Sequence, residues 1–223
     1  MALLRERMSH TMPRDYVKDP AEIYRRSFAT IDAEARLDRL PASLRAIARR
    51  MIHACGMTDL VDDLAWGGDP VAAAGRALNQ GAPILTDARM VASGIIRERF
   101  PKTEIVCVIA EDEVAETASR LRSTRSAAAI ELWRGRLQGA IVAIGNAPTA
   151  LFHLLDLIEA GGPRPAAIFA FPVGFVGAVE SKQALIEADL GIPYLTLRGR
   201  RGGSAIAAAA INALANDKPG AAA

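Results

Sequence analysis

The sequence is poor in cysteine and histidine, and it lacks a long apolar run. Its 223 residues include 2 cysteines and 3 histidines. Two cysteines give neither a disulfide framework nor a zinc-ligand spacing. No stretch approaches the roughly 18 consecutive apolar residues of a membrane span. The first ten residues also lack the apolar core of a secretory signal. We therefore expect a cytoplasmic protein without a membrane partner.

Strong charge of one sign and the common nucleotide motifs are missing too. The net charge is +2, and no basic run is interleaved with aromatics, which argues against a nucleic-acid partner. The sequence has no G-x-x-x-x-G-K-[ST], no full G-x-G-x-x-G and no G-x-S-x-G. It has no H-x-x-x-H pair either, so we expect no metal site. By count, however, 23 of the 27 basic residues are arginine, which suits a ligand with several carboxylates or simply a GC-rich genome.

The pattern of apolar residues predicts the fold. With 51% hydrophobic and 23% charged residues, the chain fits one sizeable domain over 1–223, with flexible ends at 1–15 and 216–223. Asp19 and Pro20 open a helix over 20–35, and a second helix follows Pro41 and stops at Gly56. Short apolar runs then alternate with amphipathic segments, which is typical of a parallel sheet with crossover helices. We expect strands at 64–66, 83–85, 104–109, 139–144, 166–171 and 194–197, and helices at 70–79, 88–100, 126–136, 148–159, 178–188 and 204–214.

The expected fold is thus a three-layer α/β/α arrangement. Its mainly parallel sheet has five or six strands and is preceded by two N-terminal helices. Right-handed crossovers put the carboxyl ends of the parallel strands on one edge of the sheet, where ligands of such folds bind.

His53 lies off the apolar stripe of the second helix. Leu44, Ile47, Met51 and their neighbours repeat at helical spacing, and at roughly 100° per residue His53 points away from them. A histidine in the last turn of a helix can donate a proton near neutral pH. Taken alone, however, this segment is more typical of an ordinary surface histidine near the end of a helix. Of the other two, His153 is expected to be a partly buried packing residue, and His10 lies in the N-terminal extension.

Several loops that follow predicted strands carry polar residues or paired glycines. Glycines allow a ligand to lie against bare backbone, and the start of a helix attracts anions. Each loop alone is ordinary turn chemistry, but together they favour an anion site at one edge of the sheet. Asp87 could belong to it or could cap the helix that follows. The loops contain Thr86 and Asp87, Thr124 to Ser126, Gly145 to Thr149, Pro172 to Lys182, and Arg198 to Ser204, the last residue being expected as a helix N-cap.

Seven segments, taken in order, form a specific pattern. They are Ile23-Tyr-Arg-Arg-Ser-Phe28, Arg50-Met-Ile-His-Ala-Cys-Gly56, Gly81-Ala-Pro-Ile-Leu-Thr-Asp87, Thr124-Arg-Ser-Ala-Ala-Ala129, Gly145-Asn-Ala-Pro-Thr-Ala-Leu151, Pro172-Val-Gly-Phe-Val-Gly-Ala-Val-Glu-Ser-Lys182 and Arg198-Gly-Arg-Arg-Gly-Gly-Ser-Ala205. Together they resemble the precorrin-8X methylmutase family of cobalamin biosynthesis, and the resemblance covers roughly residues 16–214.

The resemblance implies an isomerase that needs no cofactor and no metal. A methyl group would move from C11 to C12 of precorrin-8X, giving hydrogenobyrinic acid, with His53 as the proton donor. The family also implies a homodimer with active sites near the subunit boundary. Residues implied to hold the carboxylates or the ring of the tetrapyrrole are Arg125, Ser126, Asn146, Gly174, Gly177, Lys182, Arg200 and Ser204, with Thr86 beside them and with Arg25 and Ser27 as further candidates that could act from the partner subunit.

Other functions stay open at this point. A tetrapyrrole carrier that performs no chemistry would need the same binding residues. A nucleotide-dependent or S-adenosylmethionine-dependent enzyme is disfavoured by the missing phosphate loop. The motifs do not separate metal-free from cobalt-containing substrates, although the fit favours the metal-free one.

Overall fold

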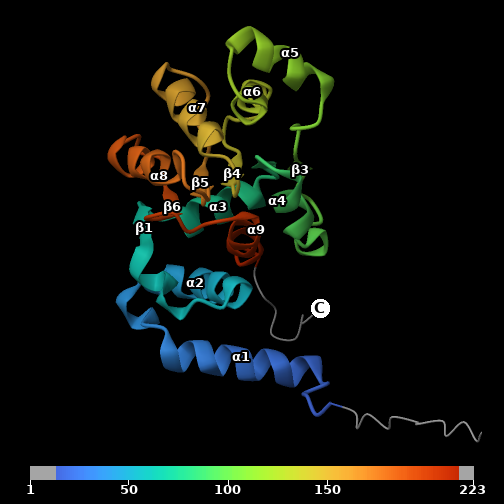
Figure 1. Cartoon of the computed structure of the whole chain (residues 1–223), viewed down its shortest axis with the longest axis vertical. Coiled ribbons are helices and arrows are strands. Elements are labelled where there is room, and N and C mark those ends of the chain that lie inside the picture. The colour runs from blue at the N-terminus through green and yellow to red at the C-terminus, as the bar shows by residue number, and fades with distance from the viewer. Residues whose placement is uncertain (1–13, 216–223) are drawn as a thin grey trace, which may run out of the picture.

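The computed structural model describes residues 14–215, in which helices cover both faces of a six-stranded sheet (Figure 1). The strands lie in the order β1-β6-β5-β4-β2-β3. This arrangement confirms the expected α/β/α fold. Of the flexible ends expected from the sequence, residues 1–13 and 216–223 lie outside the described residues. The strands are β1 (Leu64–Gly67), β2 (Ile84–Thr86), β3 (Ile105–Val106), β4 (Ile141–Ile144), β5 (Ala167–Ala170) and β6 (Tyr194–Leu197).

The α-helices form two groups around that sheet. One group packs with alternate strand residues such as Ile141 and Ala143, and the other packs with Val142 and Ile144 on the opposite face. This period of two is what a strand buried on both faces requires. The first group comprises α2 (Ala42–Cys55), α3 (Pro70–Asn79), α4 (Arg89–Gly94) and α9 (Ser204–Asn212), and the second comprises α5 (Asp112–Leu121), α6 (Arg125–Glu131), α7 (Pro148–Glu159) and α8 (Ala178–Glu187).

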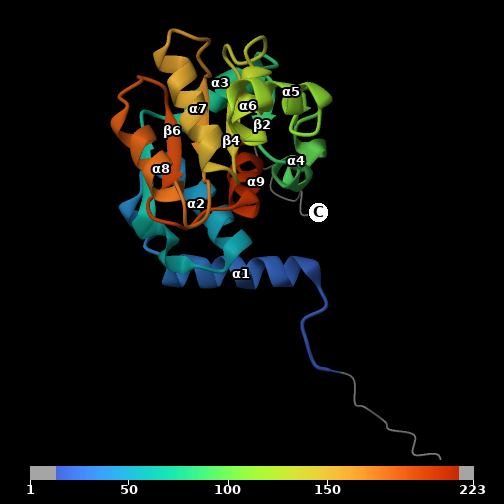
Figure 2. The same cartoon turned by 45° about the horizontal axis from the view of Figure 1, so that its top comes forward.

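The first helix, α1 (Pro20–Glu34), packs against α2 on the side away from the sheet (Figure 2). The Asp19 side chain accepts a hydrogen bond from the N–H of Ala21 at 3.0 Å, and Pro20 occupies the first helical position, as expected. At the end of α2, Gly56 adopts φ 70°, the left-handed conformation that closes a helix. The two N-terminal helices are therefore confirmed.

The sheet is mainly parallel, as expected, with one antiparallel strand at its edge. All neighbouring strands pair in parallel except β1, which runs antiparallel to β6, with Leu64 opposite Leu197. The expected strand at 104–109 is reduced to the two residues of β3. The helix α5 was not foreseen.

The expected helix over 88–100 is wrong, because it stops at Gly94. The Asn212 side chain accepts a hydrogen bond from the N–H of Ile96 at 2.8 Å and donates one to the carbonyl of Gly94 at 2.8 Å. A residue far along the chain thus satisfies backbone groups that further helical turns would otherwise use. A short 3-10 helix, η3 (Arg97–Arg99), follows; two others are η1 (Leu37–Arg39) and η2 (Thr58–Asp63).

Candidate active site

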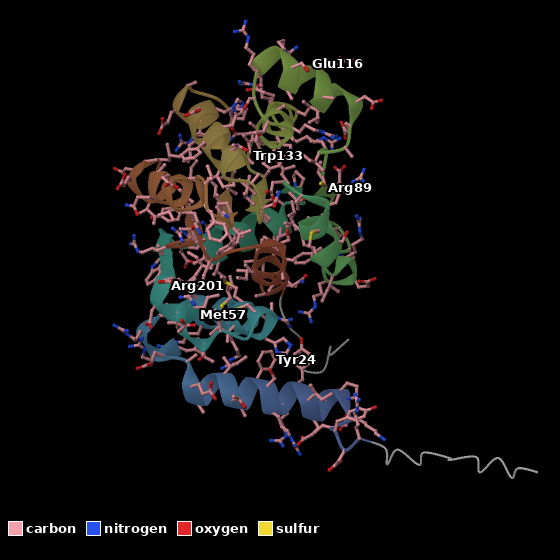
Figure 3. All side chains as sticks on the ribbon, in the orientation of Figure 1. Tyr24, Met57, Arg89, Glu116, Trp133 and Arg201 are labelled. Atoms are coloured by element: carbon pink, nitrogen blue, oxygen red, sulfur yellow. The ribbon has the colours of Figure 1, made fainter. Side chains whose placement is uncertain are left out.

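The imidazole of His53 is exposed in the last turn of α2, away from the buried stripe of that helix. Its Nδ1 lies 2.7 Å from the Ser27 hydroxyl oxygen of α1. The rings of Tyr24 and Phe28 flank it, with centroids at 5.0 Å and 5.3 Å. Tyr24 stands on the side of α1 that faces α2 (Figure 3). His53 is thus a surface group whose orientation is fixed by a neighbouring helix.

The spacing of residues on α1 produces this arrangement. Tyr24, Ser27 and Phe28 stand three and four positions apart, so they share one helical face. The two helices are further joined by an ion pair between Arg49 and Asp32 at 2.8 Å. Tyr24 and Phe28 were not predicted as site residues, although their spacing relative to Ser27 places them on the same helical face. Ser27, expected as a candidate that could act from the partner subunit, contacts His53 of its own chain, and its role toward a substrate stays a prediction.

Arg25 lies on the exposed surface of α1, where its guanidinium forms two hydrogen bonds of 2.7 Å to Glu22. Hydrogen bonds from Arg25 and then from Arg26 lower the pKa of Glu22 to about 2. Arg25 is therefore accessible, but it already has a carboxylate partner.

Three loops that follow strands are tied to one another at the carboxyl edge of the sheet. The N–H of Val173 donates to the Asn146 carbonyl at 3.4 Å, and the N–H of Gly174 donates to the Arg200 carbonyl at 3.4 Å. Gly174 and Gly177 have φ values of 135° and 78°, which favour glycine. The side chains of Asn146 and Arg200 are exposed. This edge therefore presents an amide, a guanidinium and bare backbone to solvent.

The central position of that edge is filled by Asp87. The chain runs outward from β2 to β3 and in the other direction from β4 to β5 and β6, so a topological switch point lies between β2 and β4, where ligands of such sheets commonly bind. There the carboxylate of Asp87 accepts hydrogen bonds from the N–H groups of Gly145, Asn146 and Ala147 at 2.8, 3.0 and 2.8 Å. These backbone groups cannot also bind a ligand. Only the side chain of Asn146 remains available.

Asp87 does not cap the helix that follows it, which corrects that interpretation; α4 has no side-chain cap. Burial raises the pKa of Asp87, and the three N–H groups oppose that change. Thr86 beside it is also buried, and its hydroxyl donates to the Val106 carbonyl at 2.9 Å. Both polar groups serve contacts within the fold.

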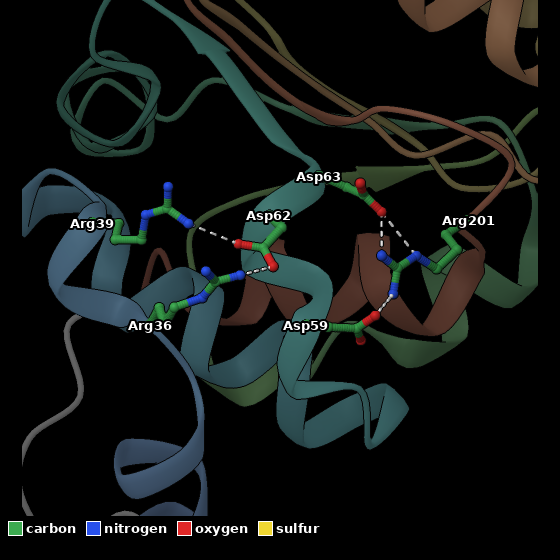
Figure 4. Close-up of polar contacts among 6 residues, drawn as sticks. All are labelled: Arg36, Arg39, Asp59, Asp62, Asp63 and Arg201. Carbon is green, nitrogen blue, oxygen red and sulfur yellow. Dashed lines mark hydrogen bonds and ion pairs between the residues drawn. The ribbon is translucent and has the colours of Figure 1, made fainter.

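Lys182 is buried as well, and its ammonium donates to the Arg201 carbonyl at 2.6 Å. Burial lowers its pKa from 10.5 to about 8, although the Asp63 carboxylate opposes the change. Arg201, which the sequence analysis did not single out as a site residue, binds Asp63 and also Asp59 at 2.9 Å (Figure 4). It thereby connects the loop after β6 to η2, the segment that follows the His53 helix.

The start of α6 presents another exposed guanidinium, that of Arg125. Arg125 donates to the Ile109 carbonyl at 2.9 Å, and the next residue, Ser126, is half-buried. Thr124 caps this helix by accepting the N–H of Ala127 at 3.1 Å. At α9 the cap is Gly203, and Ser204 is the first helical residue, so the expected serine cap is displaced by one position.

Within residues 14–215, there is no group of three or more His, Cys, Asp or Glu side chains that could hold a metal ion. His153 is partly buried as expected, and its Nε2 lies 2.6 Å from a Glu131 carboxylate oxygen. Cys55 and Cys107 are half-buried free thiols. No helix in the same range is long and apolar enough to cross a membrane.

Fold and site together define an α/β protein with an exposed, oriented histidine and arginine-bearing loops at the carboxyl edge of its sheet. A family model described as precorrin-8X methylmutase matches residues 22–217. The chain belongs to the precorrin-8X methylmutase family.

Individual relatives agree with this assignment. The precorrin-8X methylmutase of Pseudomonas aeruginosa PAO1 is 55% identical over 205 residues, which cover 92% of this chain and 99% of the relative. The cobalt-precorrin-8 methylmutase of Priestia megaterium is 36% identical over 197 residues, 87% of either chain. A solved structure of the precorrin-8X methyl mutase from Thermus thermophilus has a TM-score of 0.77 at 38% identity, covering 86% of this chain and 94% of that one. Proteins with these names are isomerases.

Proposed function

We propose that this isomerase moves a methyl group from C11 to C12 of precorrin-8X, giving hydrogenobyrinic acid for cobalamin biosynthesis, and that His53 is its proton donor. The observation that carries the role of His53 is its contact with Ser27. Because Ser27 engages Nδ1 at 2.7 Å and the imidazole is exposed, Nε2 on the opposite side of the ring is the nitrogen that a substrate can reach.

The proposed chemistry needs one proton. Protonation of a ring nitrogen near the migrating group by Nε2 favours the rearranged conjugated system, while the bond from C11 to the methyl carbon breaks and the bond to C12 forms. Substrate and product have the same composition, so the proton returns by the end of the turnover. A well-placed general acid contributes roughly 10² to 10⁴ in rate. Holding the macrocycle in a productive geometry contributes the rest.

The proposed role of the polar loops is to bind the carboxylates around the macrocycle. The exposed guanidinium groups of Arg125 and Arg200 can each bind a carboxylate in bidentate fashion. The Asn146 amide can donate to another. We also keep Ser126, Ser204, the backbone at Gly174 and Gly177, and Arg25 as candidates. Thr86 and Lys182 are buried, so we assign them the support of neighbouring backbone rather than direct contact with the macrocycle.

The metal-free substrate is part of the proposal. The relative at 55% identity is named for precorrin-8X, whereas the relative named for cobalt-precorrin-8 is 36% identical. We further propose a cytoplasmic location and a homodimer, and the exposed apolar residues Tyr16 and Ile23 before and on α1 support the homodimer. Light scattering of the purified protein measures the number of subunits.

Replacement of His53 by alanine tests the proton donor. We expect kcat to fall by about 10² to 10⁴, because the general acid is lost, while the affinity for hydrogenobyrinic acid stays the same. The change in absorption spectrum from precorrin-8X to hydrogenobyrinic acid measures turnover. His153→Gln is the matched control, since His153 pairs with Glu131 between α6 and α7, and it should retain activity.

Two outcomes would contradict the proposal. Unimpaired turnover by His53→Ala would remove His53 from the reaction. Tight retention of the product by the wild-type protein without conversion of added precorrin-8X would instead indicate a tetrapyrrole carrier.

A further inference from the structure

The most exposed large apolar side chains of residues 14–215 lie on the loop between β5 and α8. Phe175 is 84% exposed and Val176 is 89% exposed, with Val173 and Val179 partly exposed beside them. Single exposed apolar residues are ordinary, but several on one loop at a ligand-binding edge mark a contact surface.

The loop is held in this position by contacts with its neighbours. Val173 and Gly174 donate backbone hydrogen bonds to Asn146 and Arg200 in the two adjacent loops. Gly202 packs so closely on the backbone of Phe171 and Pro172 that a Cβ atom there would come within 2.3 Å of the Phe171 carbonyl oxygen. The exposure of Phe175 is therefore built into the fold.

A cation accompanies the exposed ring. The guanidinium carbon of Arg200 lies 5.4 Å from the centroid of the Phe175 ring, within the range of a cation–π contact. Arg198, on the same loop as Arg200, is also exposed. The apolar surface thus adjoins the positive charge of Arg200.

We propose that Phe175 contacts a face of the tetrapyrrole macrocycle and that Arg200, stacked on Phe175, binds one of its peripheral carboxylates. This inference rests on the proposed function. The substrate is a flat apolar ring system that carries acidic side chains. The Phe175 ring matches the ring system, and the Arg200 guanidinium matches the carboxylates. Phe175 is then a residue that determines affinity for the substrate.

A small ligand fits this surface better than a second protein does. The apolar area comes from a few side chains of one loop, whereas a stable protein interface uses roughly 20 to 30 residues on each side. The adjoining Arg200 guanidinium matches a ligand that carries carboxylates. A second copy of this chain remains a distinct outcome of the test.

The test compares Phe175→Ala and Phe175→Tyr with Leu121→Ala, a partly exposed apolar residue at the end of α5. Titration with hydrogenobyrinic acid, followed by its absorption spectrum, gives Kd; turnover of precorrin-8X gives KM and kcat. Loss of aromatic stacking should raise Kd and KM of Phe175→Ala about ten-fold with little change in kcat. Phe175→Tyr and Leu121→Ala should behave as wild type.

A double-mutant cycle with Arg200→Ala tests the coupling. Because Arg200 rests on the Phe175 ring, the double variant should lose less affinity than the product of the two single losses. Multiplicative losses would overturn the stacked pair.

Other outcomes separate this inference from the proposed function. An unchanged Kd in Phe175→Ala overturns the contact even if His53 is the proton donor. Conversely, an active His53→Ala variant removes the proton donor and leaves Phe175 untouched. If Phe175→Ala lowers the subunit number measured by light scattering, and the change in Kd follows protein concentration, the surface binds a second copy and the proposal is wrong.

Discussion

His53 and Asp87 are two titratable groups at candidate positions, and the structure treats them in opposite ways. His53 is exposed at the end of α2 and held by the Ser27 hydroxyl. Asp87 is buried at the centre of the sheet edge, where three backbone N–H groups bind it. One group is oriented and accessible, and the other is enclosed by the fold.

The difference shows where this fold leaves room for chemistry. The N–H groups at the start of α7 form the kind of anion site that many α/β proteins offer to a ligand. Here the chain supplies the anion itself through Asp87. The proposed ligand-binding groups are therefore side chains outside this backbone loop, such as those of Asn146, Arg125 and Arg200. The comparison predicts that changes at Asp87 affect stability and that changes around His53 affect turnover.

The largest effect on stability should come from Asp87→Ala. It leaves three N–H groups of the loop from Gly145 to Ala147 without an acceptor, and each unsatisfied buried group costs about 1 to 3 kcal/mol. We expect a loss of about 3 kcal/mol or more in the free energy of unfolding, measured by urea denaturation. Asp87→Asn retains one acceptor oxygen and should lose less. If Asp87→Ala lowers the free energy of unfolding no more than His53→Ala does, the expected difference between the two residues is wrong.

Lys182 extends the comparison to a buried cation. Since its pKa in the folded protein is about 8 instead of 10.5, the unfolded chain binds more protons between these values, and stability rises with pH across that window. Relative to Lys182→Met, the wild type should gain about 2 kcal/mol in the free energy of unfolding between pH 8 and pH 10.

Urea denaturation of both proteins at a series of pH values measures this difference. The exposed Lys102 supplies the control: Lys102→Met should follow the wild type at every pH. If the difference in the free energy of unfolding between wild type and Lys182→Met is constant from pH 7 to pH 10, burial of the Lys182 ammonium does not destabilise the protein.

Elements bounded by local chemistry could be predicted from the sequence. Asp19 with Pro20 opens α1, Gly56 closes α2, and the bounds of α3 and α7 agree with the expected ranges. Prediction failed where distant residues decide the structure. Asn212 takes over the backbone groups after Gly94, 118 positions away in the sequence, so no local pattern could reveal the end of α4.

In the candidate site, too, features set by local sequence could be predicted and features set by distant residues could not. The helical period correctly placed His53 off the buried face, because that depends on its own helix alone. Its contact with Ser27, 26 positions away, requires the packing of α1 on α2. Likewise, nothing local to Asp87 indicated that it binds a loop 58 to 60 positions further along the chain. Residues could be proposed from the sequence, but their partners could not.

The smallest expected effect is on turnover, and it comes from Ser27, which contacts the accessible His53. Ser27→Ala removes the hydroxyl that orients the His53 ring, while Tyr24 and Phe28 still flank it. A hydrogen bond of this kind contributes about 1 kcal/mol, so kcat should fall about five-fold to ten-fold with KM unchanged. Thr30→Ala, at an exposed position of α1, is the matched control and should be neutral.

The comparison of kcat with stability distinguishes positioning from simple structural support. If Ser27 bonds to Nδ1 of the group that donates the proton, Ser27→Ala should lower kcat with little change in the free energy of unfolding, whereas a variant that only loosens α1 should lower both. An unchanged kcat would mean that the aromatic rings alone orient His53. In that case the contrast with Asp87 becomes sharper still, because the accessible group would be positioned by packing and the enclosed group by hydrogen bonds.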